Sequence, residues 1–160
     1  MTNAKSFLFQ FQRVDTTWIY DVLSKTWSEG PRMNIKRRLH SCVVDEATST
    51  VYLMGGWNER FERINSTEKW IFGTDSWHPS INLPIDLSGS SAVSSKSNEY
   101  IGYMAGGYTS KGDDGKEGIT SKVWGLSRED KTWVELNITM QMGRYEHTLL
   151  KIPVDKVLEC

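Results

Sequence analysis

Two stretches of this chain share one pattern about fifty residues apart. Residues 51–57 read Val-Tyr-Leu-Met-Gly-Gly-Trp, and residues 101–108 read Ile-Gly-Tyr-Met-Ala-Gly-Gly-Tyr. Each is a hydrophobic run that ends in a double glycine followed by an aromatic residue. A period of this size in a sequence rich in β-forming residues predicts an array of repeated β-sheet units.

Tryptophans recur with the same pattern. A loop follows each double glycine, and two tryptophans follow the loop: Trp70 and Trp77 in the first unit, Trp124 and Trp133 in the second. We expect Trp70 to correspond to Trp124 and Trp77 to Trp133. Because a single sheet cannot bury both of its faces, we expect these side chains to cover the apolar faces of neighbouring sheets.

Arginine and histidine mark the start of alternate units. Arg37, Arg38 and His40 precede the first double glycine, and Arg144 and His147 open a later unit. In the unit between them, we expect Gly89 and Ser91 to occupy the places of Arg38 and His40.

The double glycines, the spaced tryptophans and the Arg/His mark together resemble the kelch repeat, whose period is near 50 residues. The resemblance implies an all-β fold, a partial kelch-type β-propeller of four-stranded antiparallel blades. It covers nearly the whole chain, as one repeat region over 1–160. We divide this region into an incomplete blade (1–31), two full blades (32–84 and 85–140) and the first strand of another incomplete blade (141–160).

Propellers usually close with four to eight blades, so we expect the chain to be a fragment of a longer propeller. An open array exposes unpaired strand edges and an apolar sheet face, which favours self-association through those edges.

Alternation of apolar and polar residues predicts individual strands, beginning with 17–22 and a short strand at Trp27. Residues 6–12 alternate too and stand where a double-glycine strand belongs, although the glycines are missing. The other expected strands are 40–45, 51–55, 68–72, a short one starting at Trp77, 90–93, 100–105, 122–126, 132–136 and 144–152. The loop 109–118 is rich in glycine and charge, and we expect it to be the most mobile segment.

Composition excludes several functions. The net charge is −1 with acids and bases interspersed, which argues against nucleic-acid binding and against a polybasic membrane patch. No apolar stretch is long enough to span a membrane, and the first residues do not form a signal peptide. These features favour a cytoplasmic protein. Two glycosylation sequons, at Asn65 and Asn137 in expected loops, keep an extracellular kelch module open as an alternative.

The residue types of catalysis form no recognisable constellation. His40, His78 and His147 lack the spacing of a metal site, so we expect no metal and no other cofactor. The equivalent places of His40 and His147 favour a repeated structural hydrogen bond. We expect Cys42 to be a small buried hydrophobe, unbonded to Cys160. No nucleophile elbow is present, and we expect no enzymatic activity.

The resemblance leaves one enzymatic alternative. Some kelch-like propellers are copper-radical oxidases of the galactose-oxidase type, which need a Cys–Tyr cross-link with Tyr and His ligands. Cys42 lies in an expected strand of the repeat, and no pattern of further ligands accompanies it.

The main functional expectation is therefore a non-enzymatic protein–protein interaction module. The resemblance implies that loops between strands gather at one end and bind a protein partner. It implies roles such as substrate recognition for a cullin-based ubiquitin ligase, with a BTB domain elsewhere, or actin binding. Arginine and aromatic residues are enriched at interface hot spots. The candidate partner-binding residues lie in two loops and are Asn58, Arg60, Phe61, Arg63, Lys111, Asp113 and Asp114.

Overall fold

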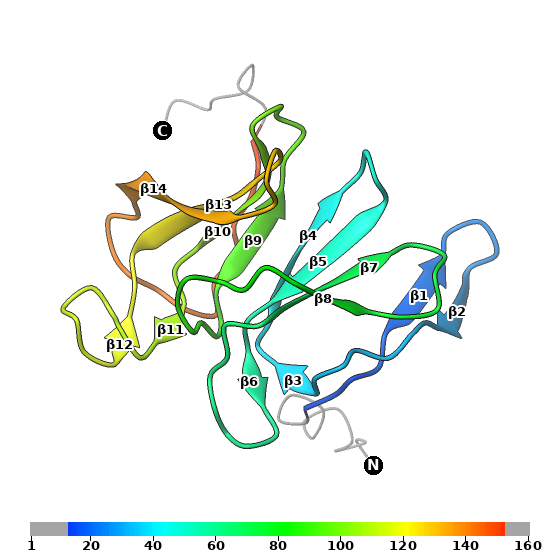
Figure 1. The fold of residues 1–160 in the computed structure, drawn as a ribbon, viewed down its shortest axis with the longest axis horizontal. Coiled ribbons are helices and arrows are strands. Elements are labelled where there is room, and N and C mark those ends of the chain that lie inside the picture. Colours follow the sequence, from blue (N-terminus) through cyan, green and yellow to red (C-terminus); the bar gives the residue numbers. More distant parts are fainter. Residues whose placement is uncertain (1–12, 153–160) are drawn as a thin grey trace, which may run out of the picture.

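The computed structural model describes residues 13–152, which form strands, turns and loops without a helix (Figure 1). The expected all-β class is confirmed for this part of the chain, and the strand expected over 6–12 lies outside it. The strands of the described part are β1 (Trp18–Asp21), β2 (Thr26–Glu29), β3 (Arg37–Arg38), β4 (Ser41–Asp45), β5 (Thr50–Met54), β6 (Trp57–Asn58), β7 (Thr67–Ile71), β8 (His78–Ser80), β9 (Ser91–Ser94), β10 (Tyr100–Ala105), β11 (Tyr108–Thr109), β12 (Gly118–Ile119), β13 (Lys122–Ser127) and β14 (Trp133–Thr139).

Two sheets have four antiparallel strands each, in the orders β4-β5-β7-β8 and β9-β10-β13-β14. Both are simple meanders, in which each strand pairs with the next long strand in sequence. The β1–β2 hairpin stands beside the first sheet, and the short ladders β3–β6 and β11–β12 lie together at one end, the lower part of Figure 1. This row of antiparallel sheets is compatible with a propeller-like fold.

The double glycines have the same role in both sheets. Gly55 and Gly106 adopt φ of 66° and 64°, a left-handed conformation that favours glycine. The next glycine donates its N–H to a carbonyl at the start of the following unit, Gly56 to Leu87 at 2.7 Å and Gly107 to Arg144 at 2.9 Å. A Cβ on Gly55 or Gly106 would collide with that same carbonyl oxygen. Glycine therefore allows each sheet to approach the next segment of backbone closely.

Three residues with positive φ line up across the units: Leu39 (φ 55°), Gly89 (φ 63°) and Glu146 (φ 52°). The N–H of Gly89 donates to the carbonyl of Leu39 at 2.9 Å, and the N–H of Glu146 donates to the carbonyl of Gly89 at 2.7 Å. This string of backbone hydrogen bonds connects one unit to the next and identifies the three residues as equivalent.

The string corrects the expected correspondence of the unit starts. Counting from Leu39 and Gly89, the places of Arg38 and His40 belong to Ser88 and Ser90, rather than to Gly89 and Ser91. Counting back from Glu146, Arg144 occupies the place of Arg37. The expectation was one residue out of register because a residue with positive φ, and not a recurring side-chain type, marks this corner.

The sheet register also corrects one pair of tryptophans. Leu53 lies opposite Glu68 in one sheet, and Met104 lies opposite Trp124 in the other. Measured from the double glycines, Trp124 therefore occupies the place of Glu68, and Leu126 occupies the place of Trp70. The expected match of Trp70 to Trp124 is wrong because the loops before them differ in length.

The core forms where neighbouring sheets face each other. One cluster lies between the two four-stranded sheets, with members that include Val43, Tyr52, Met54, Met104, Trp124, Leu126 and Trp133. A second cluster of Met33, Leu53, Trp70 and Trp77 packs against Ile19 of the β1–β2 hairpin. Trp77 and Trp133 are 5% and 8% exposed, so both cover a sheet face as expected. The first sheet thus packs one face against the preceding hairpin and the other against the second sheet.

Three local expectations are corrected. Residues 144–152 form no strand, because within 13–152 no neighbour pairs with them along a ladder; they run beside β9, where the N–H of Leu149 donates to Ser91 Oγ at 2.7 Å. Asn137 lies within β14 rather than in a loop. Cys42 is exposed, because β4 turns Ser41, Val43 and Asp45 inward and its alternate residues outward.

Candidate functional site

The loops that follow the two double glycines lie at the same end of the molecule. One loop leaves β6 and returns to β7, and the other connects β11 with β12 (Figure 1). β6 pairs with β3 at the start of its own unit, and Tyr108 of β11 likewise bridges to Ser88 at the start of its own unit. Both loops are therefore anchored to the corner where one unit passes into the next.

Asn58 organises the first loop from within. Its side-chain oxygen accepts the backbone N–H groups of Arg60 at 2.9 Å and Glu62 at 3.0 Å, and its side-chain nitrogen donates to Glu62 Oε2 at 2.8 Å. Phe61 at the tip has a φ of 60° and is 70% exposed, with the Arg13 guanidinium 4.1 Å from its ring centroid. Arg60 is exposed as well. The side chains of Arg60 and Phe61 therefore point outward, while the Asn58 side chain forms its hydrogen bonds within the loop.

Arg63 is not a surface group like its neighbours, because its side chain is only 11% exposed. The guanidinium lies over the rings of Trp57 and Tyr108, 5.1 Å and 4.8 Å from their centroids. It also forms ion pairs with Asp86, at 3.3 Å, and with Glu117 of the second loop. Arg63 thereby joins the two loops through charge and through the faces of two aromatic rings.

Asp86 is the acceptor at which both loops meet. Besides Arg63, it accepts the N–H of Ser110 at 3.1 Å and the hydroxyl of the same residue at 2.5 Å. The two loops are thus fixed relative to each other by one carboxylate on the segment between the sheets.

Two acids of the second loop are exposed but differ in their hydrogen bonds. Asp113 accepts hydrogen bonds from Thr120 Oγ1 at 2.8 Å and from the N–H of Ser121 at 2.9 Å. Burial acts to raise the pKa of Asp113, but the hydrogen bonds from Ser121 and Thr120 hold it below the usual value. Lys111 and Asp114 are exposed, and Asp114 Oδ1 accepts the N–H of Lys116 at 3.0 Å.

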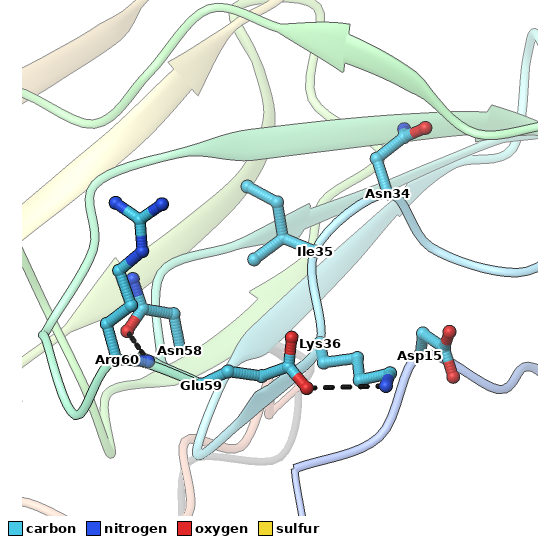
Figure 2. A pocket seen from close by; sticks show the side chains of 7 residues that line it. All are labelled: Asp15, Asn34, Ile35, Lys36, Asn58, Glu59 and Arg60. Atoms are coloured by element: carbon cyan, nitrogen blue, oxygen red, sulfur yellow. Dashed lines mark hydrogen bonds and ion pairs between the residues drawn. The ribbon is translucent and has the colours of Figure 1, made fainter.

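A pocket of about 420 Å³ opens beside the first loop (Figure 2). It lies between the segment 34–36 and the loop residues 58–60, and an ion pair of 3.3 Å between Lys36 and Glu59 connects its two sides. Ile35 is the apolar residue of a lining that is otherwise polar or charged. The lining residues are Asp15, Asn34, Ile35, Lys36, Asn58, Glu59 and Arg60.

A buried ion pair fixes one wall of this pocket. Glu68 Oε1 accepts from Arg37 at 2.6 Å, where Arg37 is fully buried and Glu68 is 3% exposed at its side chain. The same carboxylate accepts the backbone N–H groups of Asn34 at 2.6 Å and Ile35 at 3.2 Å. Burial holds the pKa of Arg37 below its usual value, with the Glu68 charge opposing. An arginine side chain nevertheless stays charged in proteins.

A second pocket, of about 390 Å³, lies over the string of left-handed residues. Trp57, Tyr108 and Tyr145 supply its aromatic surface, and the rings of Tyr108 and Tyr145 meet edge to face at 6.1 Å. Arg63 and Glu117 supply charges of both signs. Together the two pockets make this end of the molecule a hollowed surface of mixed charge and aromatic character.

The structure therefore sorts the seven candidate residues into two groups. Arg60, Phe61, Lys111 and Asp114 face solvent, whereas Asn58, Arg63 and Asp113 hold the loops in shape. Sequence reasoning missed Asp86, Glu117 and Tyr145. No sequence signal marks Asp86, because its role depends on two loops that approach each other only in the folded chain.

The histidines do not make the expected repeated hydrogen bond. Neither Nδ1 of His40 nor either ring nitrogen of His147 has a partner among the described residues. Burial, and then the neighbouring charge of Arg37, lower the pKa of His40 from 6.5 to about 4, with Glu68 opposing. Within residues 13–152, no group of three or more His, Cys, Asp or Glu side chains could hold a metal ion, and no helix could cross a membrane.

Comparison with known proteins leaves the family open. No protein-family model matches the chain, and no curated protein matches it.

Proposed function

We propose that the chain is part of a kelch-type β-propeller and that it serves as a non-enzymatic protein-binding module. The kelch assignment is supported by the double glycines, which bond the following unit in the same way in both sheets, and by the matching meander order. It also agrees with a period near 50 residues.

The observation that carries the binding proposal is the junction of the two loops at Arg63 and Asp86. A binding surface requires side chains held in place before the partner arrives, because ordering them on binding weakens affinity. Here the ion pairs and ring contacts of Arg63 fix both loops. Arg60, Phe61 and Lys111 then project from a rigid base, with an arginine and an aromatic among them.

The partner that fits is a folded protein or peptide with a mixed-charge surface and an apolar side chain able to reach Phe61 and Ile35. The resemblance implies two specific partners of this kind. One is a substrate of a cullin-based ubiquitin ligase, and the other is actin. An extracellular module is the second candidate, and one observation favours it: Asn137 is exposed on β14 within a sequon.

Site-specific photocrosslinking tests the binding surface. A photoreactive phenylalanine analogue at position 61 is expected to capture one defined protein partner in cells that express the chain. The same analogue at Leu23, which is 95% exposed on the distant β1–β2 turn, serves as the matched control. Capture equal at both positions would contradict the proposal.

Substitution separates the two groups of residues. We expect Arg60→Ala to reduce capture about tenfold with unchanged stability, as for a hot-spot arginine. Arg63→Ala is expected to lower the free energy of unfolding as well, because it leaves Asp86 and Glu117 without their shared cation. Actin cosedimentation of the purified chain, with and without Arg60→Ala, tests the actin form directly.

A further inference from the structure

The pocket of about 390 Å³ over the string of left-handed residues contains aromatic rings that are open to a ligand. Trp57 and Tyr108 follow the two double glycines, and Tyr145 lies on the segment after the second sheet. None of the three is fully buried: Tyr145 is 49% exposed, and the other two are partly exposed. The volume falls within the range of roughly 300–1,000 Å³ that is typical of ligand pockets.

A cation of the chain itself already uses part of this aromatic surface. The Arg63 guanidinium lies 5.1 Å from the ring centroid of Trp57 and 4.8 Å from that of Tyr108, within the distance of about 6 Å for a cation–π contact. Tyr145 meets Tyr108 edge to face at 6.1 Å. No cation of residues 13–152 lies over the Tyr145 ring. The ring of Tyr145 is therefore available to a further cation.

The charges at the pocket also favour a cation. Arg63 pairs with two carboxylates, those of Asp86 and Glu117. One positive charge thus stands against two negative ones, and this group of three side chains carries an excess of one negative charge. Glu146 adds another carboxylate to the lining, and Arg38 is the opposing cation there, with a contact of its own.

The Glu146 carboxylate is not engaged by the fold. The backbone N–H of Glu146 donates to the carbonyl of Gly89 at 2.7 Å, and its Cγ lies 3.3 Å from the place that a Cβ on Gly89 would take. The residue is exposed, and its carboxylate forms no hydrogen bond or ion pair within residues 13–152. Its backbone and the stem of its side chain are therefore held in place while its charge remains free.

From these groups we infer that the pocket binds the guanidinium of an arginine side chain in a protein partner. The inference rests on the proposed protein-binding function and names the partner's chemistry at this pocket. A guanidinium is planar, stacks on aromatic faces and pairs with a carboxylate through two parallel hydrogen bonds. Tyr108 and Tyr145 supply the ring surface, and Glu146 supplies the carboxylate. A lysine ammonium has the same charge but lacks the flat surface, so arginine is preferred.

The backbone holds the binding groups in place before a partner arrives. Tyr108 and Ser88 exchange two backbone hydrogen bonds, at 2.8 Å and 3.0 Å. The Gly107 N–H donates to the carbonyl of Arg144, directly before Tyr145, at 2.9 Å. Groups that are ordered in advance bind more tightly, because less conformational entropy is lost on association.

Titration with a blocked arginine tests the pocket directly. The full chain is labelled with fluorotyrosine and titrated with Nα-acetyl-arginine amide, while fluorine NMR follows the tyrosines. We expect saturable shifts of the Tyr108 and Tyr145 signals, which weaken with added NaCl. Nα-acetyl-citrulline amide, in which a neutral urea replaces the guanidinium, is the matched control. It should bind at least about fivefold more weakly.

Substitutions test the carboxylate and the ring separately. Glu146→Gln keeps the size of the side chain and should weaken the binding of the blocked arginine about two- to fivefold. Tyr145→Leu should weaken it by a similar factor, followed at the Tyr108 signal, whereas Tyr145→Phe keeps the ring face and should not. Glu129→Gln, at an exposed carboxylate in the turn between β13 and β14, should leave the affinity unchanged.

The possible outcomes separate this inference from the proposed function. No saturable shift, equal affinity for the citrulline compound, or full affinity in Glu146→Gln would overturn the arginine site. Tighter binding of Nα-acetyl-glutamate amide would overturn it too, since Arg38 and Arg63 would then make the pocket an anion site. Capture at position 61 would still support the proposed function in each case. Binding of the blocked arginine without any such capture would contradict the proposed function and leave the guanidinium pocket standing.

Discussion

At the scale of single residues, three equivalent positions show how the two units differ in side-chain chemistry while sharing one backbone path. Asn34, Arg37 and Glu68 form a buried polar network in the first unit. Pro84, Leu87 and Trp124 occupy the same places in the second. Proline has no N–H to donate, so the loss of the carboxylate leaves no unsatisfied donor at that place. The three residues change together because a buried charge or donor needs its partner.

Removing one member of the polar network should therefore be costly. We expect Arg37→Leu to lower the free energy of unfolding by about 3–5 kcal/mol, because the buried Glu68 carboxyl would lose its ion-pair partner. The triple variant Asn34→Pro, Arg37→Leu and Glu68→Trp should recover most of that loss. Urea denaturation measures both, with Lys36→Leu at the exposed pair with Glu59 as a control expected to change stability by less than about 1 kcal/mol. A triple variant no more stable than Arg37→Leu would refute the equivalence.

His40 predicts a pH dependence of stability. Its pKa in the folded state is about 4, below the unfolded value near 6.5, so the unfolded chain binds a proton first as the pH falls. Stability should decline from about pH 6.5 down to pH 4, by up to about 3 kcal/mol from this residue. His40→Ser, the residue found at the equivalent Ser90, should remove that part of the decline. Denaturant titrations at several pH values measure it, and an equal effect of His78→Ser at an exposed site would count against it.

At the scale of elements, the double glycine explains why each sheet holds the beginning of the next. Gly106 brings β10 against the carbonyl of Arg144, and Gly107 donates to that carbonyl. Residues 144–152 have no ladder of their own in the described part, so these contacts and those of Glu146 and Leu149 hold the segment to the second sheet.

Gly106→Ala should loosen that segment. The new side chain would be held at a left-handed φ and would collide with the Arg144 carbonyl oxygen. We expect the free energy of unfolding to fall by about 1–3 kcal/mol or more. Amide hydrogen exchange should become faster at Gly107 and Glu146. Gly118→Ala is the control, since a Cβ there meets nothing within 4 Å; equal effects of the two substitutions would show that the contact with Arg144 is not what matters.

At the scale of the whole molecule, stability depends on sheets that cover each other in a row. The buried Asp45 of the first sheet pairs at 2.8 Å with Arg128, which directly follows β13 of the second sheet. An apolar cluster lies between the two sheets. In residues 13–152, Trp27 at one end is exposed and Tyr103 at the other is only partly buried, so both end faces lack a covering sheet there.

If copies of the chain associate through these faces, the midpoint of thermal unfolding should rise with protein concentration, because association stabilises the folded state by mass action. Differential scanning fluorimetry over a wide concentration range measures this. Trp18→Glu with Trp27→Glu should flatten the dependence, and a midpoint independent of concentration in the unsubstituted chain would argue against association.

The sequence by itself determined the all-β class and placed most strands within about two residues, because alternation and turn residues act locally. It also located the double glycines that bond each sheet to the next unit, since only glycine tolerates such close approach. It named Arg60 and Phe61 among seven candidate partner-binding residues, and both are exposed.

Only the tertiary structure decided which residues are equivalent in the two units and which side chains are engaged in contacts with other segments. Trp124 replaces Glu68, Arg63 joins two loops at Asp86, and Cys42 faces outward. These facts depend on register and on contacts between segments far apart in the chain. Local sequence carries no record of such contacts, because a side chain's partner is set by how sheets pack and not by its neighbours along the backbone.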